Sequence, residues 1–353
     1  MEQILNLQHI SYTYHTLEGE TPALSDISFS LNKGEFAAIV GPSGCGKSTL
    51  LSLICGLLPC SDGQITINGR HLKESTTNVG YMLQHDELFE WRTIYNNVIL
   101  GLEIQHALTA RTKKRAHELL NIYGLSDFEN SRPSELSGGM RQRAALIRTL
   151  VLEPELLLLD EPFSALDGFL KDMLQREMQD FLKDYPGDMI LVTHSRDEAY
   201  KFCKELSVVD GGRILVTDET KRLFENPRML KAAKLTGCKN FSAVQRLGEH
   251  EIYATDWKMK LHTAEKVAED ITHVGIRGHW IRPEEKPGEN CLEVQVDEYI
   301  ETTFEHQYMI RKKDEETAAG LWWMRPKNSF MEDPDMGLPK YLYLPPEHLM
   351  LLK

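Results

Sequence analysis

Residues 36–49 read FAAIVGPSGCGKST, and this stretch decides the fold because five apolar residues run directly into a glycine-rich loop. The pattern Gly-x-x-x-x-Gly-Lys-Ser between a strand and a helix is a phosphate-binding loop, whose backbone N–H groups surround an anion. Lys47 supplies a positive charge to the outer phosphates of a nucleotide, and the Ser48 hydroxyl is suited to Mg²⁺. We therefore expect ATP and Mg²⁺ as cofactors. The expected nucleotide-binding residues of this loop are Gly41, Pro42, Ser43, Gly44, Cys45, Gly46, Lys47, Ser48 and Thr49.

A second motif supplies two carboxylates after another apolar run, in the stretch LLLLDEP at residues 156–162. The four leucines predict a buried strand, and Asp160 at its end is expected to project toward the bound phosphates. Asp160 is the expected Mg²⁺ partner, and Glu161 is placed to polarise a water for attack on the terminal phosphate. A strand that ends in Asp-Glu could also be an ordinary helix cap. The loop at residues 41–49 favours the catalytic interpretation.

The first two thirds of the chain alternate short apolar runs with helical patterns, which is typical of an α/β fold with a mostly parallel sheet. The expected buried strands are Phe36–Val40, Leu156–Leu159 and Met189–Val192, and the clearest helical patterns are Lys47–Cys55 and Phe169–Leu182. Residues from about 85 to 135 are charged and helical in period, which predicts a helical subdomain carried on the sheet core.

The pattern changes near Gly237, where short alternating strands separated by polar turns replace the strand–helix alternation. The expected strands are Val274–Arg277, Leu292–Val296, Tyr308–Arg311 and Leu321–Met324. We therefore expect one domain over residues 1–236 and a small β-rich C-terminal domain over residues 237–353. A regulatory role is one interpretation of that second domain.

Composition excludes several classes of protein. The chain has 353 residues and a formal charge of −13, which argues against a protein that coats nucleic acid, so no nucleic-acid partner is expected. The six cysteines include no C-x-x-C pair, which argues against zinc sites and disulfides, and we interpret Cys45 as a small filler of the loop. The N-terminus does not resemble a signal peptide, and Leu50–Leu58 is too short to span a bilayer. A membrane role would require other chains.

A third motif narrows the class: LSGGMRQR at residues 136–143, just before the second strand. Here the sequence resembles the ATP-binding-cassette (ABC) family, whose signature is Leu-Ser-Gly-Gly-Gln followed by basic residues. Met140 replaces the usual Gln but leaves Ser137, Gly138 and Gly139 in place. The resemblance implies a P-loop NTPase of the ABC type with a helical subdomain. It also implies a homodimer packed head to tail, in which this segment contacts the ATP of the second cassette.

The resemblance extends to other single positions. Gln84 matches the glutamine that reaches Mg²⁺ and water at the edge of the helical subdomain, and His194 matches the histidine that contacts the γ-phosphate and orients Glu161. Asp167 lies in the loop expected to link the two active sites of the dimer. Tyr14 matches the aromatic residue that stacks on adenine, with Tyr12 as a competitor.

The sequence similarities point to two groups of importers, both of which carry small oxyanions. Residues 80–92 and 97–103 are similar to importers of nitrate, sulfonate and taurine, whereas residues 235–240, 274–277 and 322–323 are similar to the end of molybdate-type subunits. We expect an ATP-hydrolysing importer subunit at the cytoplasmic face of the membrane. Its expected partners are permease subunits and, indirectly, an extracytoplasmic substrate-binding protein.

Three alternative functions remain at this stage. The chain could serve a molybdate- or sulfate-type importer, or it could be an ABC ATPase without a transport role. It could also be a regulatory binding module with a vestigial ATPase, although the intact Lys47, Asp160, Glu161 and His194 argue against this. In the tail, Arg277, His279 and Arg282 could bind an oxyanion, although surface or interdomain salt bridges are the favoured interpretation.

Overall fold

A computed structural model of the chain describes residues 2–17, 19–75, 77–164, 168–183, 185–327 and 338–353. The chain divides into two compact units, Met1–Lys221 and Arg222–Lys353. We describe each unit by itself.

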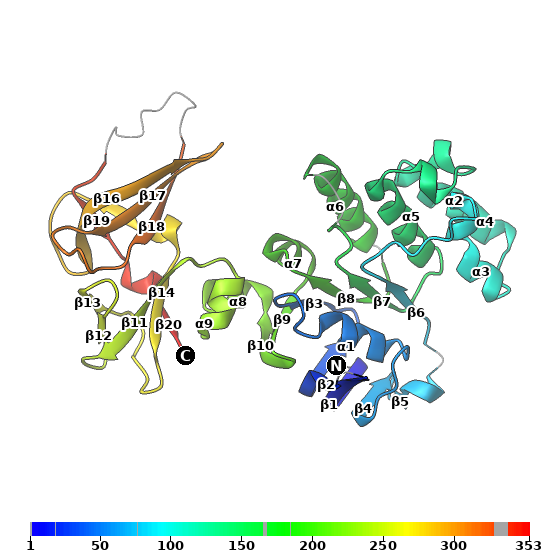
Figure 1. Cartoon of the computed structure of the whole chain (residues 1–353), viewed down its shortest axis with the longest axis horizontal. Helices are drawn as coiled ribbons and strands as arrows, with labels where there is room; N and C mark the ends of the chain where they lie inside the picture. Colours follow the sequence, from blue (N-terminus) through cyan, green and yellow to red (C-terminus); the bar gives the residue numbers. More distant parts are fainter. Residues whose placement is uncertain (1, 18, 76, 165–167, 184, 328–337) are drawn as a thin grey trace. The chain divides into compact units, whose positions relative to one another are not determined.

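Unit 1 is built on a six-stranded sheet that carries the two motifs with apolar runs (Figure 1). In spatial order its strands are β10 (Arg213–Glu219), β9 (Glu205–Asp210), β3 (Phe36–Val40), β8 (Asp188–Thr193), β7 (Leu156–Asp160) and β6 (Val79–Met82). All neighbours are parallel except β10 and β9. The three strands predicted from continuous apolar runs, β3, β7 and β8, lie in this sheet, and the α/β fold class is confirmed.

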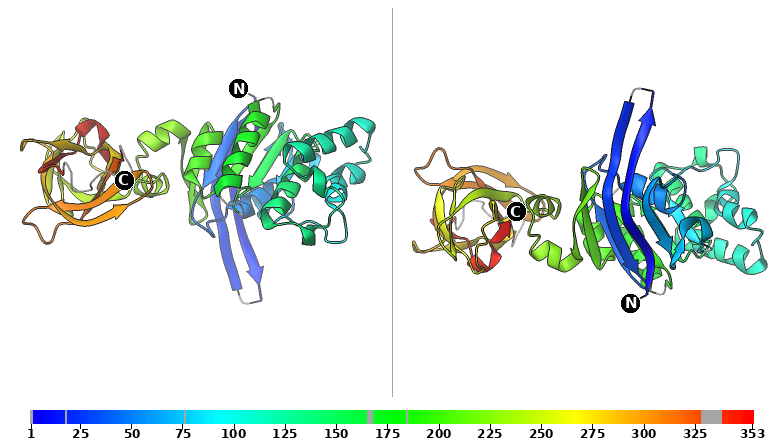
Figure 2. Two further views of the ribbon diagram at one scale, coloured as in Figure 1. Left: turned by 90° about the horizontal axis from the view of Figure 1, so that it is seen from above. Right: turned by 90° about the horizontal axis from the view of Figure 1, so that it is seen from below.

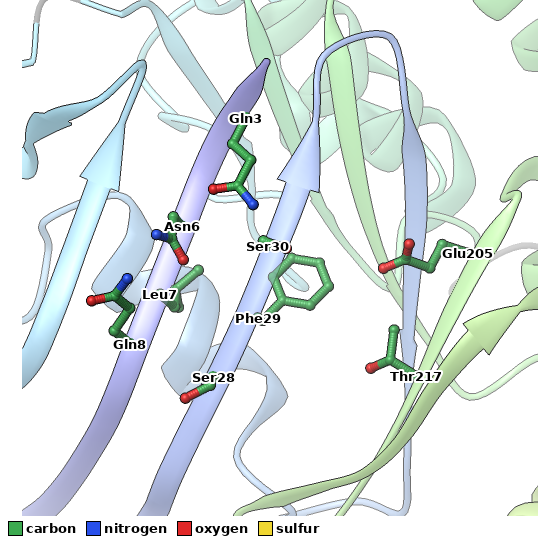
Figure 3. A pocket seen from close by; sticks show the side chains of 9 residues that line it. All are labelled: Gln3, Asn6, Leu7, Gln8, Ser28, Phe29, Ser30, Glu205 and Thr217. Carbon is green, nitrogen blue, oxygen red and sulfur yellow. The ribbon is translucent and has the colours of Figure 1, made fainter. Parts of the chain in front are cut away.

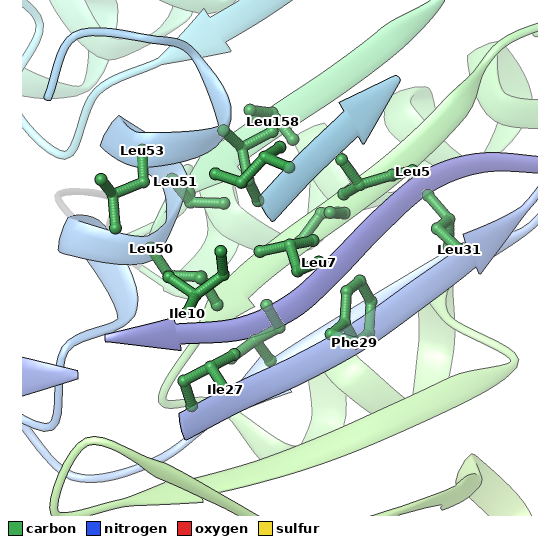
Figure 4. Close-up of a cluster of buried hydrophobic side chains, with 14 of the residues drawn as sticks. Leu5, Leu7, Ile10, Ile27, Phe29, Leu31, Leu50, Leu51, Leu53 and Leu158 are labelled. Atoms are coloured by element: carbon green, nitrogen blue, oxygen red, sulfur yellow. The ribbon is translucent and has the colours of Figure 1, made fainter. Parts of the chain in front are cut away.

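A second, antiparallel sheet of unit 1 contains β2 (Gly19–Asn32), β1 (Gln3–Thr16), β4 (Asp62–Ile67) and β5 (Arg70–His71). Figure 2 shows β1 and β2 side by side as one long twisted hairpin. Figure 4 shows how its apolar side chains, including Leu5, Leu7 and Ile27, meet Leu50 and Leu51 of helix α1 (Lys47–Ile54). The helix that follows the phosphate-binding loop is therefore anchored in a core shared by both sheets.

The predicted helical subdomain is present as a group of short helices. They are α2 (Ile94–Val98), α3 (Leu100–Ile104), α4 (Ala110–Ile122) and the 3₁₀ turns η2 (Ser126–Phe128) and η3 (Pro133–Glu135), with α5 (Gly138–Leu150) following. Two further helices, α6 (Gly168–Lys183) and α7 (Arg196–Phe202), flank β8 in the sequence. In α6 the buried Leu174, Met178 and Leu182 recur every four residues, which is the predicted apolar stripe of a packed helix. Among the described helices, none is long and apolar enough to cross a membrane.

Unit 2 consists mainly of antiparallel strands in two five-stranded sheets. One sheet contains β13 (Met259–His262), β12 (Glu251–Ala254), β11 (Asn240–Arg246), β14 (His273–Ile276) and β20 (Met350–Leu352). The other contains β15 (Arg282–Glu284), β19 (Tyr341–Tyr343), β16 (Cys291–Glu301), β17 (Glu305–Lys312) and β18 (Leu321–Pro326). Both sheets contribute to one core around Trp257, Tyr308 and Trp323. The four strands expected from alternation correspond to β14, β16, β17 and β18.

The units divide after Lys221, whereas the sequence pattern places the domain boundary after residue 236. Helix α9 (Leu230–Leu235) accounts for the difference, because the Leu230 N–H donates to the Lys353 carbonyl at 3.1 Å. Ala233 of this helix also shares a buried cluster with Met350 and Leu352 of β20. The segment therefore packs with the β-rich unit that follows it.

Arg277, one of the candidate anion-binding residues, holds the same segment in place. Its guanidinium donates to the Thr236 carbonyl at 2.7 Å and to the Phe224 carbonyl at 2.5 Å, and the residue is only 9% exposed. Its guanidinium is thus used by backbone acceptors within unit 2, whereas the sequence favours surface or interdomain salt bridges.

A fragment of residues 222–353 should therefore unfold cooperatively in urea, and a fragment of residues 237–353 should be less stable by about 3 kcal/mol or more. The shorter fragment lacks the Phe224 and Thr236 carbonyls that accept from Arg277, and it lacks the packing of α9 on β20. As a control, Arg277→Met should destabilise the longer fragment much more than the shorter one. Equal stability of the two unmodified fragments would show that residues 222–236 do not belong to this unit.

Candidate nucleotide-binding site

The loop between β3 and α1 is shaped by glycines that other residues could not replace. A Cβ on Gly41 would lie 2.1 Å from the Val209 carbonyl oxygen, and one on Gly46 would lie 2.5 Å from the Ala23 carbonyl oxygen. Gly46 also has φ of +101°, a left-handed conformation that suits glycine. The loop is thus wedged between β9 and β2, with Pro42, Ser43 and Gly44 exposed on its outer side.

Lys47 lies in the first turn of α1 and folds back over this loop. Its ammonium donates to the carbonyls of Gly41 at 2.9 Å and Pro42 at 3.0 Å, and the residue is 6% exposed. The third contact, to Cys45 Sγ at 3.8 Å, is with a weak acceptor that a phosphate oxygen would replace. Cys45 itself is buried, and burial raises the pKa of its thiol, so it is a packed filler as expected. The donors of this loop fit a nucleotide phosphate.

Asp160, at the end of β7, lies beside the start of α1. Its carboxylate is 2% exposed and is hydrogen-bonded by the hydroxyls of Ser48 and Tyr81. Burial raises the pKa of Asp160, the Ser48 hydrogen bond opposes that rise, and the neighbouring Glu161 carboxylate adds to it. Tyr81 was not anticipated from the sequence, where it appears only as an aromatic residue on a short strand.

The pairing of Asp160 with Ser48 fits the coordination that Mg²⁺ prefers in nucleotide sites. Both supply hard oxygen atoms, and the described residues contain no cluster of three His, Cys, Asp or Glu side chains that could hold a metal by themselves. A Mg²⁺ bound here would take further ligands from phosphates and water, as is usual for this ion. Gln84, the other expected ligand, is exposed just after β6.

Glu161 and His194, the two residues expected to take part in catalysis, lie in contact with each other. Glu161 Oε2 lies 3.1 Å from His194 Nδ1, and the Glu161 side chain is 14% exposed against 62% for His194. Glu161 has φ of +50°, an unusual backbone conformation that its N–H to the Val192 carbonyl, at 2.9 Å, helps to hold. The carboxylate therefore faces a side chain that reaches solvent from the next strand.

Tyr14 lies at the entrance to the loop and Tyr12 does not. The Tyr14 hydroxyl is 3.1 Å from the Thr49 hydroxyl, and the residue is 38% exposed. Tyr12 instead packs against the core of unit 1, with its ring edge-on to Tyr14 at 5.0 Å. The geometry therefore favours Tyr14 over Tyr12 as the aromatic residue that could stack on the adenine ring of a nucleotide.

Ser137, Gly138 and Gly139 lie at the start of α5, after the helical subdomain. Ser137 caps this helix, since its hydroxyl accepts from the Met140 N–H at 3.3 Å. Ser137 and Gly138 are exposed, and a Cβ on Gly138 would meet no atom within 4 Å. This helix end is thus open to an anion from outside. Asp167 lies outside the described residues.

The segment that follows Gln84 is fixed to α5 by several contacts. Arg148 donates to the carbonyls of Asp86 and Glu87 at 2.8 and 2.7 Å, and Arg141 pairs with Asp86 at 3.0 Å. The segment ends in two exposed aromatic residues, Phe89 and Trp91, whose rings lie 4.7 Å apart.

Two cavities lie apart from the residues assigned to the nucleotide. One of about 510 Å³ is lined by residues of β1, β2, β9 and β10, among them Gln3, Asn6 and Glu205 (Figure 3). The other, of about 540 Å³, lies in unit 2 and is lined partly by Lys258, Lys260 and Lys312. Neither cavity is lined by a residue predicted for nucleotide binding or catalysis.

Comparison with known proteins agrees with this geometry. The ABC transporter family model matches residues 24–164. The chain is 43% identical over 262 residues to "Uncharacterized ABC transporter ATP-binding protein YtlC" of Bacillus subtilis, which covers 74% of this chain and 97% of that protein. It is 40% identical over 203 residues to "Taurine import ATP-binding protein TauB" of Pelagibacter ubique, covering 57% of this chain and 77% of that protein. Other relatives are named for import of sulfate/thiosulfate and of Fe(3+) ions.

A solved structure shows the same cassette fold. It is described as "Dimeric structure of a post-hydrolysis state of the ATP-binding cassette MJ0796 bound to ADP and Pi". The similarity has a TM-score of 0.57 and 27% sequence identity, over 61% of this chain and 98% of that chain. The phosphate-binding loop and the two acidic residues are thus those expected from the family match. The chain belongs to the ATP-binding proteins of ABC transporters and is an ATPase.

Proposed function

We propose that the chain hydrolyses MgATP with Glu161 as the residue that activates water. The observation that supports this most directly is the Glu161–His194 contact of 3.1 Å, next to the buried Asp160. Lys47 and the loop amides would bind the phosphates, while Ser48, Asp160 and Gln84 would hold Mg²⁺, which neutralises the charge that develops on the phosphates. Glu161 would accept a proton from the attacking water, and His194 would fix the position of that carboxylate. Tyr14 would stack on adenine.

We infer that two copies act together, with Ser137, Gly138 and Gly139 of one subunit completing the site of the other. Their exposed position at a capped helix start supports this, because an open N-terminus attracts a phosphate. The dimeric relative supports the same arrangement. Asp167 would lie between the two sites.

We further propose that this homodimer drives an importer from the cytoplasmic face of the membrane. The names of the relatives support an import role, and the permease subunits would dock on Phe89 and Trp91. Leu88, which directly precedes Phe89, is 8% exposed and belongs to the core. The proposed cargo is a small oxyanion of the nitrate, sulfonate and taurine class, delivered by an extracytoplasmic substrate-binding protein. The alternative is a molybdate- or sulfate-type cargo.

For unit 2 we propose a regulatory role in which an anion binds between its strands. The lysine-lined cavity of about 540 Å³ supports this better than Arg277, which is bound by backbone carbonyls. The cavity lining contains more lysines than glutamates, although the chain is acidic overall. The lysines are Lys258, Lys260 and Lys312, and the glutamates are Glu289 and Glu315.

The composite site predicts complementation between two inactive variants. Ser137→Arg should abolish hydrolysis but retain ATP binding, because a bulky cation blocks the contact to the partner's nucleotide. Lys47→Ala should lose ATP binding. An equimolar mixture should regain activity, since each mixed dimer keeps one complete site, and phosphate release measures it.

Ser134→Arg serves as the matched control, because Ser134 is also exposed and lies three residues earlier. This variant should remain active by itself. An inactive mixture in which mixed dimers are demonstrated by mass spectrometry would contradict the head-to-tail arrangement.

The docking proposal predicts that Trp91→Ala uncouples ATP hydrolysis from transport. The side chain is 71% exposed, so its removal should leave the basal ATPase rate of the isolated chain unchanged. In vesicles that contain the permease, the transport-linked rate should fall about tenfold, as expected for loss of a central aromatic contact. Tyr200→Ala removes another exposed aromatic side chain and should affect neither rate. Equal loss of both rates in Trp91→Ala would show that Trp91 stabilises the subdomain instead.

A further inference from the structure

A buried hydroxyl group stabilises the backbone turn that contains His194. Thr193, the last residue of β8, is 1% exposed, and its hydroxyl oxygen accepts from the Ser195 N–H at 3.0 Å. The same hydroxyl donates to Glu198 Oε2 at 2.5 Å. One hydroxyl therefore joins the residue before His194 to the residue after it, while the His194 side chain itself is largely exposed.

Glu198 also stabilises this turn, through hydrogen bonds to Thr193 and Ser195. It lies in the first turn of α7, where its N–H donates to the Ser195 hydroxyl at 3.4 Å. The residue is 3% exposed, and a carboxylate in such a position is costly unless a cation compensates it. The compensating cation is Lys171, whose Nζ lies 2.6 Å from Glu198 Oε1.

Lys171 connects this turn to a different part of the site. It lies in the first turn of α6, which begins at Gly168, directly after the segment that contains Asp167. The chain of contacts therefore runs from the start of α6 through Lys171 and Glu198 to the Thr193 hydroxyl and the Ser195 N–H, on either side of His194.

A second contact between the same helices provides a comparison. Lys201 Nζ donates to Gln175 Oε1 at 2.9 Å, about one helical turn further along both α6 and α7. Gln175 is 5% exposed and Lys201 is exposed, so this contact is partly buried, and it does not involve Thr193 or the turn at residues 193–195. Two contacts therefore join α6 and α7, and only the Lys171–Glu198 contact continues to the turn that contains His194.

We propose that Lys171 and Glu198 are positioning residues for ATP hydrolysis, which set the place of His194 according to the position of the start of α6. The inference rests on the proposed role of His194. A displacement of Lys171 at the start of α6 would move its ammonium, and the Glu198 carboxylate and the Thr193 turn would follow. The pair thereby couples the start of α6 to the position of His194.

The test compares Lys171→Met, Glu198→Gln and the conservative Lys171→Arg with the matched control Lys201→Met. The first two should lower kcat about tenfold at nearly unchanged KM for ATP, because misplaced groups slow the chemical step without weakening binding. Lys171→Arg should restore most of kcat. Lys201→Met should leave kcat unchanged, although it removes a contact between the same two helices.

Hydrogen exchange of the full-length protein without nucleotide gives a readout independent of activity. The Ser195 amide should exchange about tenfold faster in Lys171→Met and Glu198→Gln but not in Lys201→Met, because only the first two loosen the Thr193 turn. Equal protection of that amide in all variants overturns the inference, as does a fall of kcat in Lys201→Met that matches the fall in Lys171→Met.

A His194→Ala arm separates this inference from the proposed function. If His194→Ala is inactive and Lys171→Met keeps normal kcat, the positioning role is wrong while the catalytic assignment stands. If His194→Ala hydrolyses ATP at the normal rate, the proposed role of His194 is wrong, and the positioning role that depends on it is overturned with it.

Discussion

The site depends on one geometric constraint, the in-register parallel pairing of β3, β8 and β7. Val40 of β3 is paired with Thr193 of β8, and Asp160 of β7 is paired with Val192 of β8. Because parallel strands end at the same edge, the residues that follow each strand meet there. That edge brings together Lys47, the Asp160–Glu161 pair and His194, which lie far apart in the sequence. A slip in this register would separate the phosphate-binding loop from the carboxylates.

The site residues at this edge of the sheet differ in how deeply they are buried. Lys47 and Asp160 are almost fully buried, so each charge needs partners, which the loop carbonyls and the Ser48 and Tyr81 hydroxyls provide. Glu161 and His194 are more exposed and can approach a water. The division into a buried part that we propose binds the nucleotide and a more accessible part that we propose reacts follows from the position of each residue relative to the strand ends.

Sequence reasoning predicted the buried strands well because a continuous apolar run of this length is distinctive, as Leu156–Leu159 shows. It did not anticipate the β1–β2 hairpin, whose irregular register interrupts the alternation, or the association of α9 with β20, which joins residues more than a hundred positions apart. The roles of Tyr81 and Glu198 were also missed, because each depends on a neighbour from another element. By contrast, the loop residues, Asp160 and Glu161 could be identified from motif spacing and His194 from the family resemblance, and the structure places them at one sheet edge.

The central claim is that Glu161 activates water at this edge, and Glu161→Gln tests it most directly. The substitution keeps the size and polarity of the side chain but removes its capacity to accept a proton. In a single-turnover measurement with MgATP, we expect normal nucleotide binding and phosphate formation slower by about a hundredfold or more. Phosphate formation at the rate of the unmodified chain, with normal binding, would contradict the account.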